Sequence, residues 1–273
     1  MIKKISFIHG FGGNSSHWRW VADRLSPGFD LTFFDLPGHG SSDVIDGPHT
    51  IRAAAEAFLE ELEAPSIVVG HSMGVRIALQ AADIAPDQVR GLVLVDGSAQ
   101  SIPAAAIIES FYRLMMEKGY ESFCEDLLAG FLTHGLPRSL RRELLDSLLD
   151  IGVFTASDYW ISMAHFDNAA LESCLANTAC PILAIQSTAV LESVGRGRVY
   201  AHEAPETRWS TLLAAEPNVD VEVLKNIGHY SMIEVPDVVA DLIGSFVTEL
   251  QSTRIGPDVI PTDGRDISAS AHG

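Results

Sequence analysis

Residues 66–74 read Ser-Ile-Val-Val-Gly-His-Ser-Met-Gly, so that an apolar run leads directly into Gly70-His71-Ser72-Met73-Gly74. The run predicts a buried strand, and the Val-Arg-Ile-Ala-Leu that follows at 75–79 predicts a helix. A serine with a glycine two places to either side fits the tight strand-to-helix turn of a nucleophile elbow, where Oγ stands clear of the backbone. The N-terminus of the following helix would direct its dipole and free N–H groups at the charge that develops during acyl transfer. This context predicts that Ser72 is a nucleophile.

On both sides of this stretch, short apolar strands alternate with helical patterns. Strands are expected at 2–8, 31–35, 66–69, 89–95, 181–185 and 219–224, and helices near 16–25, 50–62, 73–85, 205–215 and 236–250. The strands are continuously apolar rather than alternating, which predicts a parallel sheet covered by helices on both faces. Ligands of such sheets bind beyond the carboxyl ends of the strands, where the loops at 9–13, 35–42, 70–74 and 96–98 are expected.

The alternation is interrupted between residues 98 and 179, where only helical patterns occur. They lie at 104–118, 120–132, 140–149 and 156–166. An all-helical insertion after a sheet strand predicts a cap over the pocket. The expected division is therefore a core at 1–97, a helical cap at 98–179, a second part of the core at 180–251, and a flexible tail at 252–273, which is polar and lacks periodicity.

The charge of the chain limits its partners. Of its 273 residues 36 are acidic and 18 basic, a formal net charge of −18, which argues against nucleic acid and anionic membranes and leaves a small molecule as the expected partner. No run reaches the length of a membrane span or of a signal-peptide core, so a cytoplasmic protein is expected. Cys124, Cys174 and Cys180 lack metal-ligand spacing, and neither a metal nor an organic cofactor is expected. The oligomeric state stays open.

Four motifs in order carry a resemblance to a known family. They are His9-Gly10-Phe11-Gly12-Gly13, Asp35-Leu36-Pro37-Gly38-His39-Gly40-Ser41-Ser42, the segment around Ser72, and Gly228-His229. With them the chain resembles the α/β-hydrolase superfamily over residues 2–100 and 180–250. The resemblance implies an α/β fold with a mostly parallel, doubly wound sheet, without the two leading strands of many relatives, and an all-helical cap inserted after the sixth strand of the family fold.

The resemblance also implies catalytic roles. Ser72 would be the nucleophile and His229 the general base, which takes the proton from Ser72 and returns it to the leaving group. The oxyanion hole would consist of two backbone N–H groups, those of Met73 and Phe11. His9, His39 and His71 belong to the motifs and are expected to shape turns or to pack beside the site.

The sequence departs from the family in its acid. Relatives usually carry an aspartate shortly after the strand that follows the cap, but here Gln186 to Leu191 contain no carboxylate before Glu192. Asp96 directly follows the strand at 89–95 and is expected at the same sheet edge as Ser72. We therefore expect Asp96 to orient His229, with Glu192, a cap residue or a dyad without an acid as alternatives. Asp96 could also be a simple turn or N-cap residue before Gly97.

These residues predict the hydrolysis of a carboxylic ester or lactone through an acyl-enzyme on Ser72. Trp160, His165 and Tyr230 are candidate pocket residues, although His165 could equally be an ordinary histidine at the cap interface. Further apolar side chains predict a mostly apolar acyl or aryl substrate: Phe11, Met73, Phe111, Met115, Phe131 and Phe166. A carbon–carbon bond hydrolase or lyase on the same serine and histidine, and a ligand receptor with negligible turnover, remain as alternatives.

Overall fold

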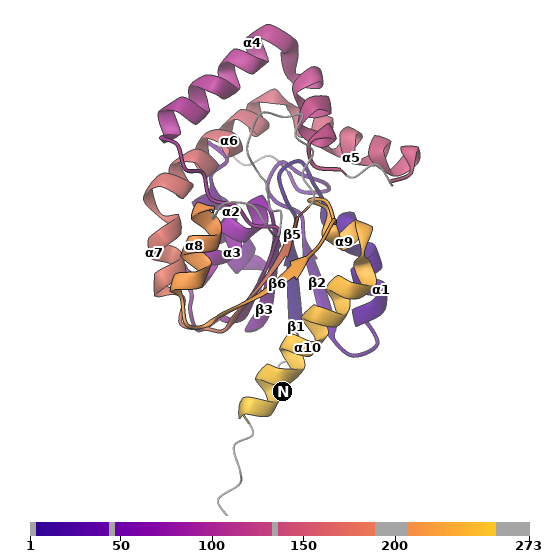
Figure 1. Cartoon of the computed structure of the whole chain (residues 1–273), viewed down its shortest axis with the longest axis vertical. Helices are drawn as coiled ribbons and strands as arrows, with labels where there is room; N and C mark the ends of the chain where they lie inside the picture. The colour runs from indigo at the N-terminus through magenta and orange to yellow at the C-terminus, as the bar shows by residue number, and fades with distance from the viewer. Residues whose placement is uncertain (1–3, 44–46, 133–135, 189–206, 255–273) are drawn as a thin grey trace, which may run out of the picture.

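The computed structural model describes residues 4–43, 47–132, 136–188 and 207–254. Its centre is a six-stranded sheet in the order β2-β1-β3-β4-β5-β6, and each neighbouring pair of strands is parallel (Figure 1). The strands are β1 (Lys4–Ile8), β2 (Asp30–Phe34), β3 (Ser66–His71), β4 (Val89–Val95), β5 (Ile182–Ser187) and β6 (Val219–Leu224). The predicted parallel sheet is confirmed, and it begins in the described residues with the strand before the glycine-rich loop.

The register of the central strands brings two predicted site residues together. Every residue of β3 is buried, as expected for a strand with helices over both faces. In the pairing of β3 with β4, His71 lies opposite Val95. Ser72 follows His71 at the end of β3, and Asp96 follows Val95 at the end of β4. Both residues therefore leave the sheet side by side at its carboxyl edge.

Helices cover both faces of the sheet (Figure 1). On one face lie α1 (Arg19–Leu25) and α10 (Pro236–Arg254), and on the other lie α2 (Ile51–Glu61), α3 (Met73–Ile84) and α8 (Arg208–Ala215). Residues 73–82 of α3 are all buried, because this helix packs against the sheet and against neighbouring helices. The predicted tail at 252–273 begins inside α10, and its residues 255–273 lie outside the described part of the chain.

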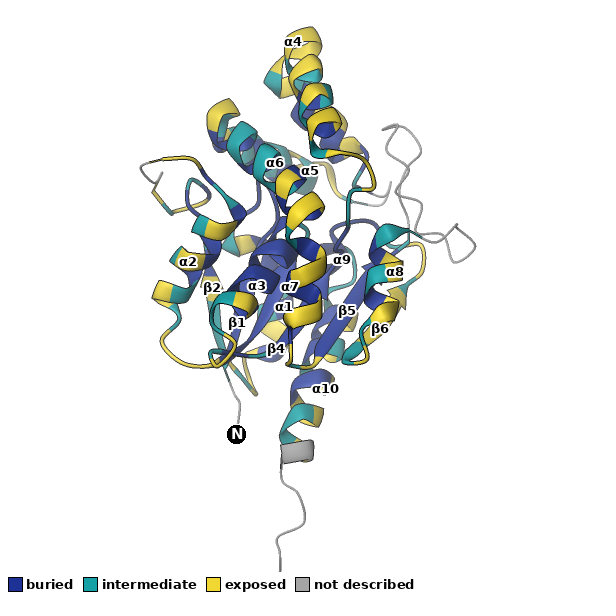
Figure 2. Cartoon of the chain, turned by 90° about the vertical axis from the view of Figure 1, so that its left-hand side faces the viewer, coloured by how far each residue is buried: buried dark blue, intermediate teal, exposed yellow. Residues whose placement is uncertain are grey.

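The carboxyl edge of the sheet is covered by α4 (Ala104–Ala129), α5 (Arg138–Asp150) and α6 (Gly152–Ala169) (Figures 1 and 2). Helix α4 is kinked at Gly119, whose φ of 79° lies outside the helical region, so two predicted helices meet there. Helix α7 (Leu171–Asn177) falls within the predicted cap segment but packs against α3 of the core. Among the described helices, none is long and apolar enough to span a membrane.

Candidate active site

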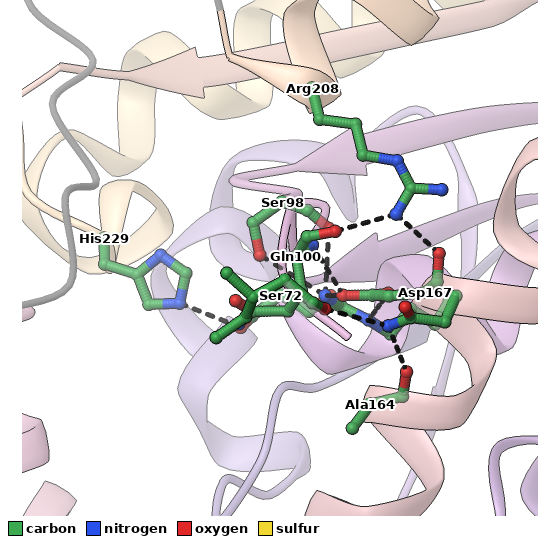
Figure 3. A network of polar contacts seen from close by, with 10 residues as sticks. Ser72, Ser98, Gln100, Ala164, Asp167, Arg208 and His229 are labelled. Carbon is green, nitrogen blue, oxygen red and sulfur yellow. Dashed lines mark hydrogen bonds and ion pairs between the residues drawn. The ribbon is translucent and has the colours of Figure 1, made fainter. Parts of the chain in front are cut away.

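Ser72 occupies a strained turn between β3 and α3. Its φ of 53° and ψ of −108° lie in a region that non-glycine residues rarely adopt. A Cβ at Gly70 would come within 2.3 Å of the carbonyl oxygen of Gly74, and one at Gly74 within 2.7 Å of the carbonyl oxygen of His9. The two glycines are therefore required by close packing, and the turn holds Ser72 Oγ 2.8 Å from Nε2 of His229 (Figure 3).

His229 lies between β6 and the short helix α9 (Ser231–Glu234), and its backbone is fixed on both sides. Its N–H donates to the carbonyl oxygen of Phe131 in the cap at 2.9 Å. Its carbonyl oxygen accepts from Nε2 of His71 at 2.8 Å, which gives His71 a positioning role beside the site. The backbone that carries the imidazole is thus held by one residue of the elbow and one of the cap.

Asp96 follows the end of β4 and lies near the ring of His229. One of its oxygens accepts from the N–H of Ser187, at 2.7 Å, and from the Ser187 hydroxyl, and the other accepts from Oγ of Ser231 at 2.6 Å. Burial raises the pKa of Asp96 to about 6, although these serine bonds favour the charged form. A carboxylate oxygen and one ring nitrogen each of His71 and His229 lie within 4.8 Å of one another.

The structure therefore brings Ser72, His229 and Asp96 together, and it gives Asp96 more hydrogen bonds than a turn residue needs. The alternative acid Glu192 lies outside the described residues. His71, Asp96 and His229 also have the chemistry of metal ligands. However, Nε2 of His71 and both oxygens of Asp96 are already engaged in hydrogen bonds, so a metal would have to displace contacts that hold the site.

The glycine-rich loop approaches Ser72 closely. A Cβ at Gly10 would lie 2.8 Å from Nδ1 of His71 and 3.1 Å from Cβ of Ser72, so a larger residue would force its neighbours to shift. Gly12 donates its N–H to Nε2 of His39 at 3.1 Å. In the opposite direction, Leu36 donates its N–H to Nε2 of His9 at 3.0 Å.

This exchange ties the loop at 9–13 to the loop at 35–42. It requires both rings to be neutral, and burial lowers the pKa of His9 to about 4 and that of His39 well below its ordinary value. Phe11 directly follows Gly10, the residue of this fixed loop that approaches Ser72. Met73 directly follows Ser72 and begins α3.

A cavity between the cap and the sheet edge opens onto Ser72 and His229. Eight of the described residues that line it are apolar or aromatic, two from the core (Phe11 and Tyr230) and six from the cap (Ile107, Leu127, Phe131, Trp160, Met163 and Ala164). Trp160 and Tyr230 are thus found in the predicted place. Phe111 instead stacks behind Trp160, with ring centroids 5.3 Å apart, and Met115 and Phe166 are likewise not among these lining residues.

His165 was expected in the pocket, and this expectation is wrong. Its side chain is exposed, and it is not among the described lining residues. The reason is helical periodicity: Trp160, Met163, Ala164 and Asp167 share the cavity face of α6, and the position after Ala164 points away from that face.

Sequence reasoning missed a buried ion pair in the cavity wall. Nε and Nη2 of Arg76 each donate to an oxygen of Asp167 at 2.7 Å, and both side chains are almost completely buried. A signal for Arg76 was available, because it follows Ser72 by one helical turn and so lies on the same face of α3. Asp167 comes from α6 in the cap, and no local pattern connects it to Ser72.

Comparisons with known proteins agree with this arrangement. A family model described as "Alpha/beta hydrolase family" matches residues 7–242. A pimeloyl-[acyl-carrier protein] methyl ester esterase of Methylococcus capsulatus is 33% identical over 147 residues, which cover 52% of this chain and 57% of that relative. An esterase of the same name from Yersinia pseudotuberculosis is 29% identical over 261 residues, or 89% of this chain and 92% of the relative.

Solved structures show the same fold at lower identity. The enol-lactonase of Burkholderia xenovorans has a TM-score of 0.72 at 19% identity, and the match covers 91% of this chain and 92% of that one. A thermophilic esterase of Thermogutta terrifontis has a TM-score of 0.70 at 19% identity, with 90% of both chains covered. At this level of identity the likeness bears on the fold alone.

Proposed function

The chain belongs to the α/β hydrolase family, as predicted, and we propose that it is a serine hydrolase that cleaves a carboxylic ester or lactone through an acyl-enzyme on Ser72. The observation that carries the proposal is the 2.8 Å contact between Ser72 Oγ and Nε2 of His229 at a strained strand-to-helix turn. Relatives named as esterases and a lactonase neighbour support an ester-acting hydrolase.

In the first half-reaction, His229 accepts the proton of Ser72 while Oγ attacks the carbonyl carbon of the substrate. The carbonyl oxygen becomes negatively charged and accepts hydrogen bonds from the N–H groups of Phe11 and Met73. His229 then gives the proton to the leaving alkoxide, and the acyl group remains on Ser72.

In the second half-reaction, a water molecule attacks the acyl-enzyme while His229 takes its proton. The tetrahedral intermediate collapses, His229 returns the proton to Oγ, and the carboxylic acid leaves. In both halves Asp96 stabilises the imidazolium of His229 and holds its tautomer, a role that the 4.8 Å cluster and the Ser187 and Ser231 bonds support.

The cavity supports a substrate with a mostly apolar acyl or aryl group. Trp160, Phe131 and Leu127 face the space beside Ser72. The relatives are named for the methyl ester of a pimeloyl-[acyl-carrier protein]. We propose esters and lactones with a mostly apolar acyl or aryl group as the substrate class.

The test is labelling and turnover with Ser72→Ala. We expect the parent to take up one equivalent of a fluorophosphonate probe by intact mass and to hydrolyse p-nitrophenyl esters. Ser72→Ala should take up none and lose several orders of magnitude in kcat. Ser173→Ala, which changes an exposed serine on α7, is the matched control and should behave as the parent.

Residual activity of Ser72→Ala within tenfold of the parent would contradict the serine mechanism. Cleavage of a β-diketone or a cyanohydrin with no cleavage of esters would instead support the carbon–carbon hydrolase or lyase. A labelled protein that turns over none of these compounds would support the receptor.

A further inference from the structure

Part of the cavity wall is polar, although α4 and α6 of the cap contribute mostly apolar residues to it. Arg76 on α3 is 3% exposed and Asp167 on α6 is fully buried, and both line the cavity. Figure 3 shows Asp167 next to Ser98, Gln100 and Arg208, in a network that joins the cap to the core. A buried ion pair is a costly way to fill an apolar core, so its position against the reacting serine calls for an explanation.

The hydrogen bonds of the Arg76 guanidinium leave one donor over. Its Nε–H and one Nη2–H go to Asp167, and the other Nη2–H goes to the carbonyl oxygen of Ser98 at 2.9 Å. Nη1 carries two N–H groups, and its contact within the described chain is a long one, 3.4 Å, to the carbonyl oxygen of Ser72. At least one Nη1–H therefore has no acceptor in the described residues, although the side chain is buried at the cavity wall.

Gln100 adds a second polar group to this wall. Its backbone N–H donates to Asp167 at 3.0 Å and its carbonyl oxygen accepts from Arg208 at 2.7 Å. These bonds fix the main chain, and the carboxamide makes no hydrogen bond within the described part of the chain. Gln100 is half-buried and lines the cavity with Arg76.

We propose that Arg76 and Gln100 form an oxygen-binding subsite, so that the preferred substrates carry a second, neutral carbonyl oxygen on the acyl chain. The inference rests on the proposed function of Ser72. The subsite lies in the same cavity as the acyl-forming serine, because Ser72, Arg76 and Gln100 all line it. The second oxygen is therefore expected within a few bonds of the scissile carbonyl.

A neutral acceptor fits better than a carboxylate because Asp167 already balances Arg76. Their ion pair has no net charge, and Arg208, which reaches the network through two carbonyl oxygens, is not among the described residues that line the cavity. A buried carboxylate would lack its own counter-ion here, whereas a keto oxygen needs only a donor.

The energetic consequence is substrate selectivity. A substrate with the second carbonyl satisfies the buried Nη1–H, while a hydrocarbon analogue of the same shape displaces water and leaves that donor unpaired. We expect a preference of roughly 10- to 100-fold in kcat/KM.

The experiment uses three pairs of methyl esters. Within each pair, one ester has a carbonyl group where the other has a CH–CH₃ group. The pairs are 3-oxobutanoate and 3-methylbutanoate, 4-oxopentanoate and 4-methylpentanoate, and 5-oxohexanoate and 5-methylhexanoate. With the full-length protein, the oxo ester of at least one pair should have the higher kcat/KM by tenfold or more, and the position of that carbonyl gives the distance of the subsite from Ser72.

Two variants separate recognition from a merely structural role. Gln100→Leu removes the carboxamide but keeps the backbone bonds and the ion pair, and Arg76→Met with Asp167→Leu removes both charges without leaving one unpaired. Each should lower the oxo-to-methyl ratio, the double variant to within about threefold of unity. Gln88→Leu, which lies before β4 at the opposite edge of the sheet, is the matched control and should keep the parent ratio.

Ratios within threefold for all three pairs in the parent, with Ser72 still labelled and esters still cleaved, would overturn the subsite and leave the hydrolase standing. Unchanged ratios in both variants would do the same. A higher kcat/KM for monomethyl succinate than for methyl 4-oxopentanoate would overturn the neutral acceptor. If Ser72 is not labelled and no ester is cleaved, the proposed function itself fails.

Discussion

At the scale of single residues, Asp96 is the sharpest test of the site. Asp96→Asn keeps the shape of the side chain but presents an amide that can stabilise the wrong tautomer of His229. We expect kcat to fall by roughly 10²- to 10⁴-fold. Glu192→Gln is the comparison and should stay within a few-fold of the parent. If Glu192→Gln is the crippled variant and Asp96→Asn stays active, the acid is not Asp96.

The same substitution separates catalysis from stability. The pKa of Asp96 is raised by burial from 3.8 to about 6, so its contribution to stability is present below pH 3.8 and is lost as the pH rises through 6. At pH 7.5 the charged carboxylate costs free energy in the folded state. Asp96→Asn removes that cost, and we expect its Tm by calorimetry at pH 7.5 not to fall. A loss of activity together with a fall of many degrees would indicate a structural role.

Ser231 provides a prediction on pH dependence. Its hydroxyl donates to Asp96 at 2.6 Å and favours the charged carboxylate, so Ser231→Ala should raise the pKa of Asp96 further above 6. Activity that needs the carboxylate is present above this pKa and lost below it. The acidic limb of kcat against pH should therefore move to higher pH in Ser231→Ala. An unmoved limb would argue that the charge of Asp96 does not govern turnover.

At the scale of elements, the kink of α4 depends on one glycine. Gly119 has a φ of 79° and a ψ of 168°, and an added Cβ would meet no atom within 4 Å, so the cost of Gly119→Ala is conformational strain alone. The chain cannot relieve it by straightening, because Phe111 before the kink and Phe123 after it both pack on Trp160. We expect a loss of about 1–2 kcal/mol of unfolding free energy.

Gly244→Ala is the matched control, with the opposite sign. Gly244 is helical, within α10, and an added Cβ would make ordinary contacts with Leu25 at 3.5 Å and Phe29 at 3.7 Å. Because alanine is the better helix former, we expect a gain of about 0.5–1 kcal/mol. Urea unfolding of both variants measures the two changes in unfolding free energy. A gain in Gly119→Ala like that in Gly244→Ala would show that α4 does not need its kink.

At the scale of the whole molecule, buried histidines couple folding to pH. Burial lowers the pKa of His9 to about 4 and that of His17 to about 3, and nearby His9, His71 and Arg19 add to the effect at His17. In the unfolded chain these rings titrate near 6.5. Their contribution to stability is therefore complete above pH 6.5 and is lost as the pH falls toward 4, because only the unfolded state takes up protons there.

His17→Phe isolates this effect. The Nε2 of His17 is buried without a partner in the described residues, so phenylalanine keeps the ring and loses no hydrogen bond at that atom. The net charge of −18 also shrinks in acid, but it does so in parent and variant alike. Relative to the parent, His17→Phe should gain about 2 kcal/mol between pH 8 and pH 5. A difference in Tm that does not change with pH would contradict this prediction.

The sequence alone predicted the order of the strands, the parallel sheet and the strand-to-helix turn at Ser72. Each of these rests on information that is local in the chain. Continuously apolar runs predict buried strands, and glycines at 70 and 74 reflect contacts with atoms a few residues away or at the end of β1. The kink at Gly119 was also visible as the boundary between two helical patterns. The ends of helices and the single turn of α9 were less visible, because one turn has no periodicity.

Only the tertiary structure decided which side chains share the cavity. Asp167 lies 91 residues after Arg76, and nothing in the pattern of α6 distinguishes it from an exposed acid until the cap folds onto α3. His165 was misplaced for the same reason, since the face that a cap helix turns to the cavity depends on its packing. The surroundings of Asp96, which Ser187 and Ser231 hold, likewise depend on strand register and on a turn from the far end of the chain. Local periodicity specifies elements, whereas polar contacts between distant segments are specified only when burial forces their donors and acceptors to pair.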